Sequence, residues 1–318
     1  MSKGTVTRNC PHSSAESAFI DSLRSLATNP AARGLDDDAA VLEMGGETLV
    51  LTHDMIVEGV HYLPGDPPAD VAWKLLAVNL SDLAAKGARP IGVLLGFTLG
   101  EAAWDRAFAA GFGAALAAFG IPLLGGDTVS APARVLGLTA IGRATGPVPS
   151  RSGARPGDLL WVSGTIGDAG AGLKALRGEP GGGAALIERY RNPRPRLEAG
   201  ERLAPLVRAM MDVSDGLLID AARMAAASAC AAEIELDSIP LSEAFAATPL
   251  EAATAGDDYE LLFAAAPDQA AVLLALGEEI GLPFSRIGRF AAGAGLTLTR
   301  AGTPVPLPSR LGYEHCRC

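Results

Sequence analysis

PADVAWKLLAVNLSDLAAKGARPIGVLLGFTL, residues 68–99, is the stretch that decides the fold class, because a helical pattern is followed directly by a strand pattern. We predict a helix from Pro68 to Lys86 and a strand from Ile91 to Leu99. The alternation continues outward, with helices predicted at 14–28 and 217–228 and strands at 39–42, 48–52, 135–144, 159–163, 232–236 and 259–264. Strands that alternate with helices indicate α/β or α+β layers.

Residues 107–126 carry no charge and have the length of a membrane span. Their periodicity indicates a helix with one core-facing side, because apolar residues recur every three or four positions: Trp104, Phe108, Phe112, Leu116 and Phe119. Gly120 stands where a C-terminal cap belongs, and residues 121–124 are typical of a short strand. We therefore expect a buried helix that leads into a strand, and no membrane segment.

The chain has 318 residues, with 36 acidic against 26 basic side chains and a net charge of −10. This length suffices for two domains, and 49% hydrophobic against 19% charged residues excludes a disordered chain. The acidic balance argues against a nucleic-acid partner, because phosphate binding along a strand needs a basic stripe. A Gly/Pro/Arg-rich connection at 150–158 predicts a boundary between domains 1–149 and 150–318.

Four scattered cysteines, Cys10, Cys230, Cys316 and Cys318, are too few for a disulfide framework and indicate a reducing compartment. No basic flank leads into an apolar run near residue 1, so we expect no signal peptide. Together these features predict a cytoplasmic protein without a membrane partner.

Aspartates gather at the ends of the predicted strands and helices: Asp36-Asp37-Asp38, Asp54, Asp82, Asp127, Asp212, Asp215 and Asp257-Asp258. If these ends converge, two carboxylates ~4 Å apart repel by about 4 kcal/mol at an effective dielectric near 20, so a cation must lie among them. Oxygen ligands from several loops suit Mg²⁺, which substrate phosphates help to coordinate. A cap or turn role explains any one aspartate. For five or six together, the metal interpretation is favoured.

Two of these clusters also suit a phosphate. The glycines of Gly125-Gly126-Asp127-Thr128 follow a predicted strand and allow close backbone approach, with a tight turn as the alternative. In Asp212-Val213-Ser214-Asp215-Gly216, Ser214 or Asp215 is the expected N-cap of the next helix, which is compatible with an anion site. The phosphate signatures G-x-x-x-x-G-K-S/T and G-x-G-x-x-G after a strand are missing. A phosphoryl-transfer enzyme with this sequence would rely on aspartates and metal.

Taken together, the motifs resemble the thiamine-monophosphate kinase family, in the superfamily of aminoimidazole ribonucleotide synthetase and selenophosphate synthetase. The matching stretches run in family order: DDAAV at 37–41, DMIVEGVHY at 54–62, VNLSDLAAKGA at 78–88, GGDT at 125–128, RSGA at 151–154, DVSDGL at 212–217 and DYELLF at 258–263. The Val-His-Tyr, Ser-Asp-Leu-Ala-Ala and Asp-Tyr-Glu-Leu segments favour this family over its relatives.

The resemblance implies ATP- and Mg²⁺-dependent phosphorylation of thiamine phosphate to thiamine diphosphate by direct in-line transfer, with no general base. It implies Mg²⁺ ligands at Asp38, Thr52, Asp54, Asp82, Asp127, Asp212 and Asp215. It further implies ATP contacts from Gly126, Asp127 and Ser214, and thiamine phosphate contacts from His61 and Asp257. The implied fold is a two-domain α/β (α+β) fold of the aminoimidazole ribonucleotide synthetase type. Its N-terminal domain forms a shared β-barrel in a homodimer.

The sequence departs from the family pattern in five places. Asp36 stands where the family has glycine before the Asp pair, and His53 stands where threonine is common. Asp257 stands where the family has glutamate, and Arg310 stands where an aromatic residue is expected. Pro147 replaces an ATP-contacting arginine, for which Arg143 and Arg151 are both candidate substitutes. Two alternatives therefore stay open: a related ATP-dependent enzyme with another acceptor, or a non-catalytic protein that binds thiamine phosphate or a nucleotide.

Overall fold

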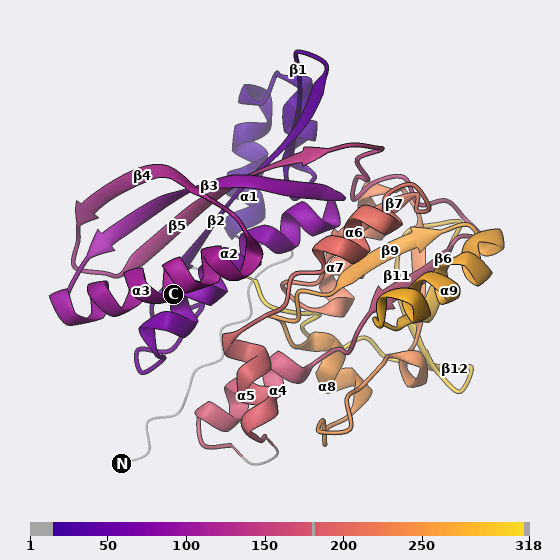
Figure 1. Ribbon diagram of the computed structural model, residues 1–318. Coiled ribbons are helices and arrows are strands. Elements are labelled where there is room, and N and C mark those ends of the chain that lie inside the picture. Colours follow the sequence, from indigo (N-terminus) through magenta and orange to yellow (C-terminus); the bar gives the residue numbers. More distant parts are fainter. Residues whose placement is uncertain (1–14, 180–181, 315–318) are drawn as a thin grey trace.

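The computed structural model describes residues 15–179 and 182–314, which form two β-sheets with helices packed against them (Figure 1). The N-terminal sheet has the strand order β1-β2-β5-β3-β4. Its strands are β1 (Ala40–Met44), β2 (Glu47–Val57), β3 (Ala88–Leu99), β4 (Leu123–Ser130) and β5 (Val135–Ala144). Only the β3–β4 pair is parallel. A strand lies at each predicted place, but the limits differ. Strand β2 extends five residues beyond the predicted end at 52, β3 begins three residues before 91, and β4 runs from 123 to 130 where only 121–124 was predicted.

Helix α2 (Pro68–Ala85) confirms the predicted helix and lies at the centre of the molecule (Figure 1). Every residue from Val71 to Ala85 except Trp73 is buried. One side of α2 packs under the N-terminal sheet, while Ala84 and Ala85 at its end belong to the core of the C-terminal part. Polar side chains on this helix therefore need partners from both halves of the chain.

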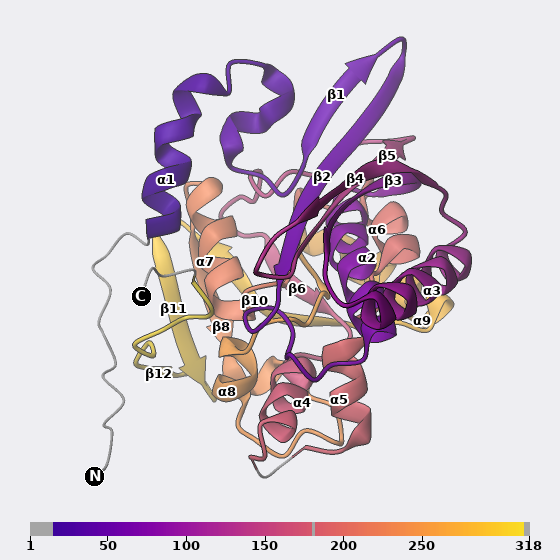
Figure 2. The same ribbon diagram turned by 90° about the vertical axis from the view of Figure 1, so that its left-hand side faces the viewer.

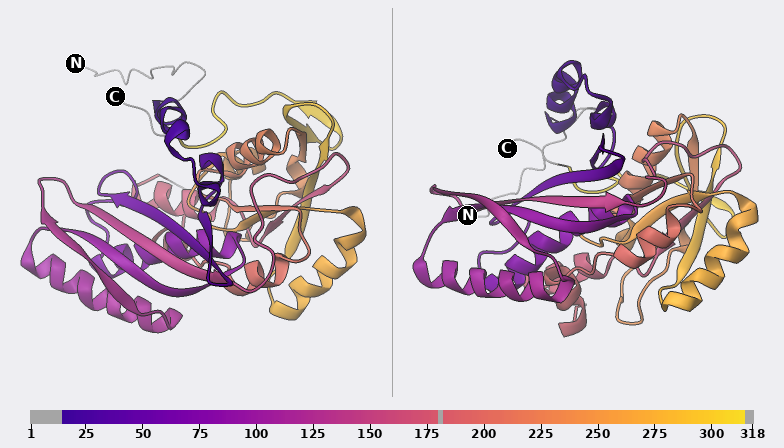
Figure 3. Two further views of the ribbon diagram at one scale, coloured as in Figure 1. Left: turned by 90° about the horizontal axis from the view of Figure 1, so that it is seen from above. Right: turned by 45° about the horizontal axis from the view of Figure 1, so that its top comes forward.

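Helix α3 (Ala102–Phe119) lies beside α2 on the same face of the sheet (Figure 3). Gly120 caps it in the left-handed conformation at φ 66°, as predicted. The expectation of a buried helix was wrong, because only Phe108, Phe112 and Ala115 are buried and an alanine-rich side faces solvent. Within the described ranges, no helix combines the length and apolar character that crossing a membrane would require.

The C-terminal sheet has the order β12-β11-β8-β10-β6-β9-β7, with only the β8–β11 pair parallel. Its strands are β6 (Leu159–Ser163), β7 (Ala209–Asp212), β8 (Ala231–Glu235), β9 (Leu261–Ala265), β10 (Phe284–Ala291), β11 (Gly295–Arg300) and β12 (Thr303–Val305). The sequence predicted β6, β8 and β9 and missed the other four. Mixed sheets make the fold α+β.

Six helices accompany this second sheet: α4 (Asp168–Leu176), α5 (Ala184–Arg191), α6 (Leu197–Leu203), α7 (Leu217–Ala227), α8 (Pro249–Thr254) and α9 (Ala270–Ile280). Helices α7 and α8 share one core cluster with the sheet, and α6 and α9 share another. The predicted domain boundary at 149/150 falls in the segment between β5 and β6, and we keep it as a proposal.

Helix α1 (Ala15–Leu23) stands beside the end of α7 (Figure 2). It is shorter than the predicted amphipathic helix 14–28 and continues as a 3₁₀ turn, Arg24–Leu26. Its apolar side is not buried, since Phe19 is 64% and Leu26 is 74% exposed.

Within the described ranges, no α-helix covers the face of the N-terminal sheet opposite α2 and α3 (Figure 3). The strand register places Met55 and Leu94 on this face, together with Val129 near the end of β4. Leu124 joins them, because its side chain lies where a Cβ on Gly92 would point. All four apolar side chains are exposed, and β4 is an edge strand that is exposed along its whole length.

Candidate functional site

An acidic cavity of about 680 Å³ lies between the two halves of the chain, under α1 and the end of α7. Five of the predicted metal ligands line it: Asp38 before β1, Asp54 on β2, Asp82 on α2, and Asp212 and Asp215 after β7. Thr52 does not line the cavity, but its hydroxyl donates a hydrogen bond to Asp82 Oδ2. The sequence clusters thus converge as expected, with Asp127 as the exception.

Helix α2 fixes this convergence through the residues Asn79-Leu80-Ser81-Asp82. The side-chain oxygen of Asn79 accepts the backbone N–H of Asp54 at 2.9 Å and so ties β2 to the helix. The Ser81 hydroxyl donates to Asp212 Oδ2 at 2.6 Å and ties β7 to the same helix turn. The first bond is partly buried and the second is fully buried, and through them one helix sets the positions of acids from both halves of the chain.

The segment Asp212–Gly216 is capped differently from the prediction. Gly216, at φ 127°, is the N-cap of α7, and neither Ser214 nor Asp215 caps it through a side chain. Instead Asp220, inside the first turn, accepts the backbone N–H groups of Ser214 and Asp215 at 3.1 and 3.2 Å. Burial and the nearby Asp215 carboxylate raise the pKa of Asp220 to about 7, although Arg223 opposes this.

One group of acids has its own cations. Lys86 pairs with Asp37 and, at 2.7 Å, with Asp38, while Arg33 contacts Asp37 at 2.5 Å and Arg151 contacts Asp38. Burial alone would raise the pKa of Asp38, but Lys86 and Arg151 outweigh it and hold this pKa well below its ordinary value. At the far wall, Arg223 contacts Asp215 at 2.5 Å and Asp220 at 2.9 Å.

The second group has no such partners. Burial and the carboxylates of Asp38 and Asp215 raise the pKa of Asp54 to about 6. Burial and neighbouring carboxylates also raise the pKa values of Asp82 and Asp212 well above the ordinary range. No lysine or arginine in the described ranges forms an ion pair with these three acids. Their mutual repulsion is the electrostatic signature of a site that needs an added cation.

Within the residues that the structure describes, no three His, Cys, Asp or Glu side chains are close enough to enclose one metal ion. Mg²⁺ does not require such a cage, since it binds through one or two carboxylates and completes its shell with water and phosphate oxygens. The donor set therefore fits Mg²⁺ ions that enter with a phosphate ligand.

A second cavity of about 530 Å³ adjoins the first, and Asp54, Ser214 and Asp215 line both. Its walls include His61, Asp257, Tyr259 and Tyr313. The backbone N–H of Val57 donates to His61 Nδ1 at 3.0 Å, which puts the proton of a neutral ring on Nε2.

Asp257 is held from two sides. The ammonium of Lys74, itself 2% exposed, contacts Asp257 Oδ2 at 2.9 Å, and the Tyr259 hydroxyl donates to Oδ1 at 3.0 Å. Asp257 and Tyr259 both have positive φ values, 67° and 52°, which are strained for residues with a Cβ. The two contacts hold the Asp257 carboxylate in a fixed position at the wall of the second cavity.

Gly126 and Asp127 are the predicted residues that the chain does not bring to the cavity. They lie within the exposed edge strand β4, neither after a buried strand nor in a tight turn. A Cβ on Gly126 would lie 1.9 Å from the Leu95 carbonyl oxygen, so this glycine is required by strand packing. Register places Asp127 in one row with Gly96, Gly137 and Met55, on the open face of the sheet.

The sequence reasoning missed several residues of the site, namely Lys74, Lys86, Arg223, Tyr259 and Tyr313. Lysines inside an apolar helix, such as Lys74 and Lys86, were a usable signal, because a buried lysine needs a carboxylate partner. Tyr313 had no comparable signal. It lines the second cavity although it lies beyond the last strand, whereas the exposed Arg310 does not line it.

Comparison with known proteins gives a consistent picture. Residues 36–144 match the N-terminal domain of AIR synthase related proteins, and residues 155–300 match their C-terminal domain. A curated thiamine-monophosphate kinase from Caulobacter vibrioides is 41% identical over 304 residues, which are 90% of this chain and 86% of that protein. The corresponding enzyme from Salmonella typhimurium is 38% identical over 302 residues, 89% of this chain and 91% of that protein.

Two solved structures extend the comparison. The crystal structure of thiamine-monophosphate kinase from Stenotrophomonas maltophilia K279a is 40% identical with a TM-score of 0.75, covering 91% of this chain and 96% of that one. The structure of AaThiL complexed with AMPPCP and TMP is 28% identical with a TM-score of 0.82. This second similarity covers 98% of this chain and 100% of that one.

Proposed function

The chain belongs to the thiamine-monophosphate kinases among the AIR synthase related proteins, and on that premise we propose that it transfers a phosphoryl group from ATP to thiamine phosphate in the presence of Mg²⁺. The product is thiamine diphosphate. The junction of the two cavities carries this proposal. Because Asp54, Ser214 and Asp215 line both, a nucleotide phosphate in the acidic cavity would face an acceptor in the second. The relative solved with AMPPCP, an ATP analogue, and TMP supports this pairing of ligands.

The reaction needs little proton chemistry from the protein. The attacking atom is a phosphate oxygen that is already ionised near neutral pH, so no general base has to activate it. Positioning of the two phosphates and neutralisation of their charge are what accelerate such transfers. A cavity with many carboxylates, arginines at its walls and no assigned base matches this requirement.

We propose that Mg²⁺ is held by Asp38, Thr52, Asp54, Asp82, Asp212 and Asp215. We propose that Asp127 also binds Mg²⁺, but in the cavity of a second chain. The chemistry that Mg²⁺ supplies when bound is neutralisation of the charge on the transferring phosphoryl group. Support comes from Asp54, Asp82 and Asp212, whose raised pKa values mark carboxylates that are short of positive charge. The protein holds these three acidic residues in fixed positions through hydrogen bonds with Asn79, Ser81 and Thr52.

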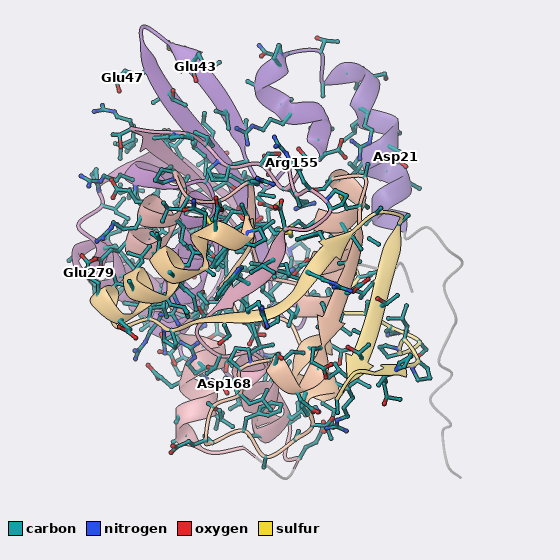
Figure 4. All side chains as sticks on the ribbon, turned by 90° about the vertical axis from the view of Figure 1, so that its right-hand side faces the viewer. Asp21, Glu43, Glu47, Arg155, Asp168 and Glu279 are labelled. Carbon is teal, nitrogen blue, oxygen red and sulfur yellow. The ribbon has the colours of Figure 1, made fainter. Side chains whose placement is uncertain are left out.

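For the arginine that contacts ATP, the geometry favours Arg151 over Arg143. Arg151 lines the acidic cavity, and its guanidinium, which also contacts Asp38, has several N–H donors of the kind that suit phosphate oxygens. Arg143 pairs with Glu47 at 2.7 Å. Glu47 lies at the tip of the β1–β2 hairpin, far from Asp21 at the cavity wall (Figure 4). With Ser214, Arg151 would form the protein side of the nucleotide-phosphate site.

We place thiamine phosphate in the second cavity. Its thiazolium ring is cationic, which suits the fixed carboxylate of Asp257 and the aromatic ring of Tyr313. We propose that Tyr313 supplies the aromatic contact that is absent at Arg310. His61 would donate from Nε2 to the acceptor phosphate.

Two chains would join through the open sheet face and the unpaired edge of β4 to form the shared barrel. Exposed apolar side chains on that face and an uncovered edge strand support this homodimer. In it, Asp127 would serve the cavity of the partner subunit, since its side chain lies on the face opposite its own cavity, and the backbone of the neighbouring Gly126 would approach the same ligand. Equal mixing of Asp127→Asn and Asp82→Asn chains, with subunit exchange, should then restore about a quarter of native activity. Residues acting within one chain would give no recovery.

The proposed activity is tested by incubating the protein with Mg-ATP and thiamine phosphate and measuring thiamine diphosphate by chromatography. A curated relative such as the Salmonella enzyme serves as the positive control. Failure to form product while the control works would exclude the proposal, and ADP release with other phosphorylated acceptors would identify a different one. We also propose that the chain works in the cytoplasm, because Cys230 is a free thiol and the proposed reaction uses ATP.

A further inference from the structure

Lys86 does not line the acidic cavity but lies directly behind it, as a fully buried lysine in contact with Asp37 and Asp38, which do line it. Its side chain is 0% exposed, and it occupies the C-cap position of α2. Its ammonium contacts Asp37 Oδ1, Asp38 Oδ2 at 2.7 Å and the Met210 carbonyl oxygen at 3.2 Å. Two of these contacts, to Asp37 and to Met210, are hydrogen bonds, and the third, to Asp38 Oδ2, is an ion pair.

The backbone keeps this ammonium in place. Gly87 follows at φ 61°, and a Cβ there would lie 2.5 Å from the Ala204 Cβ. From the other side, a Cβ on Gly200 would lie 1.9 Å from the Ala84 carbonyl oxygen. The end of α2 is therefore clamped against α6 and its following residue. Lys86 cannot turn toward solvent without separating these two segments.

The contacts of Lys86 also join the two halves of the site. Asp37 and Asp38 belong to the loop before β1, and Met210 belongs to β7, two residues before Asp212. Lys74, the other buried lysine of α2, pairs with Asp257 at the second cavity and lies over the ring of Tyr190. Lys86 alone of the two acts on the acids of the first cavity.

We propose that Lys86 is a resident cation of the metal site, which neutralises Asp37 and Asp38 and fixes the position of Asp38 before a divalent ion or nucleotide binds. This inference rests on the proposed metal-assisted function. If Lys86 neutralises Asp37 and Asp38, the acids that still need an added cation are Asp54, Asp82 and Asp212. Lys86 is thus a positioning residue, and it touches no substrate.

The test compares thermal unfolding of the native chain and Lys86→Met, each with EDTA and with saturating Mg²⁺. Without Mg²⁺ the variant should unfold about 6 to 12 °C below the native chain, since a buried ion pair is broken. With Mg²⁺ the difference should shrink by about half or more, because a bound ion replaces the missing charge and stabilises the folded state. A difference that Mg²⁺ leaves unchanged would mean that Lys86 only fills space, and would overturn the inference.

Lys74→Met is the matched control, because it removes an equally buried lysine from the same helix. Its loss of stability should be the same with and without Mg²⁺. If Lys86→Met does not fold under either condition, the test uses a charge-balanced double variant instead, in which Asp37→Asn is combined with Lys86→Gln. That double variant should recover most of the native unfolding temperature in EDTA. A double variant that is also unfolded in EDTA would overturn the inference.

The proposed function and this inference fail separately. A native chain that shows no stabilisation by Mg²⁺ and forms no thiamine diphosphate contradicts the function. A native chain that responds to Mg²⁺, beside a Lys86→Met variant with the same response, contradicts only the role of Lys86.

Discussion

Two groups of acids share one cavity and differ in their neighbours. Asp37 and Asp38 contact Lys86, Arg33 and Arg151, and their pKa values are lowered although burial opposes this. On the other side, Asp54, Asp82 and Asp212 have raised pKa values, caused first by burial and then by other carboxylates. We call these the paired and the unpaired acids.

The two groups of acids therefore have different roles: the paired acids contribute to stability, and the unpaired acids contribute to function. A paired acid stabilises the metal-free fold, because removing it leaves a buried cation without a partner. An unpaired acid destabilises the metal-free fold and becomes favourable only when a cation binds. Raised pKa values in a cleft are typical of functional sites for this reason. Residues of one type in one cavity are thus expected to respond in opposite ways to the same substitution.

The largest expected effect is on an unpaired acid. Asp82→Asn should lower kcat by about 10²- to 10³-fold, since it removes a carboxylate that acts on the charged phosphoryl group. The unfolding temperature in EDTA at pH 8 should stay level or rise, because the substitution relieves repulsion from Asp54 and Asp212. Steady-state kinetics and circular dichroism melts measure the two quantities. Native turnover in this variant would remove Asp82 from the site.

The next effect concerns a paired acid. Asp38→Asn should lower the unfolding temperature in EDTA by about 6 to 12 °C, because Lys86 and Arg151 lose a buried partner. Asp36→Asn is the matched control two residues away. Asp36 pairs with Arg24 at 2.7 Å, but its side chain is 60% exposed, so its loss should change the unfolding temperature by less than about 2 °C. Equal shifts in the two variants would contradict the comparison.

Much of this arrangement is readable from the sequence. Helix α2 and strands β5 and β6 end within a residue of their predicted limits, because apolar periodicity and Gly/Pro punctuation determine them locally. The unpredicted strands β10 and β11 lie in the last part of the chain, and their pairing with β6 and β8 is a long-range feature that local patterns do not encode.

The convergence of the acids was also predictable, since the predicted elements put each of them at an element end, although Asp54 lies inside β2 and Asp82 inside the last turn of α2. Which acids are paired was not. That depends on Lys86 and Arg151, which come from a helix end and from the connection before β6 and meet Asp38 only in the folded chain. Asp127 shows the reverse case. Its motif suits a phosphate, but sheet register places it on the open face, where only a second chain could use it.

The smallest expected effect is a dependence of folding stability on pH. It arises largely from the unpaired acids, so it can be measured on the native chain without substituting a paired acid. The pKa of Asp54 is about 6 in the folded chain, against about 3.9 in an unfolded one. Between these values the folded state binds more protons than the unfolded state, so stability falls as pH rises. This contribution is fully present below about pH 4 and is lost as pH rises through about 6. Asp82 and Asp212, whose pKa values are also raised, should extend the fall to higher pH. Asp220, whose pKa is about 7, adds a fall of its own that Asp54→Asn leaves in place.

In EDTA, the unfolding temperature should therefore drop by about 3 to 6 °C between pH 5 and pH 7. Saturating Mg²⁺ should flatten this dependence, because a bound cation stabilises the ionised carboxylates and lowers their pKa values. Asp54→Asn should reduce the slope in EDTA and make it less sensitive to Mg²⁺. If the native unfolding temperature instead rises from pH 5 to pH 7 in EDTA, then Asp54, Asp82 and Asp212 have cationic partners in solution. The distinction between paired and unpaired acids would then not hold.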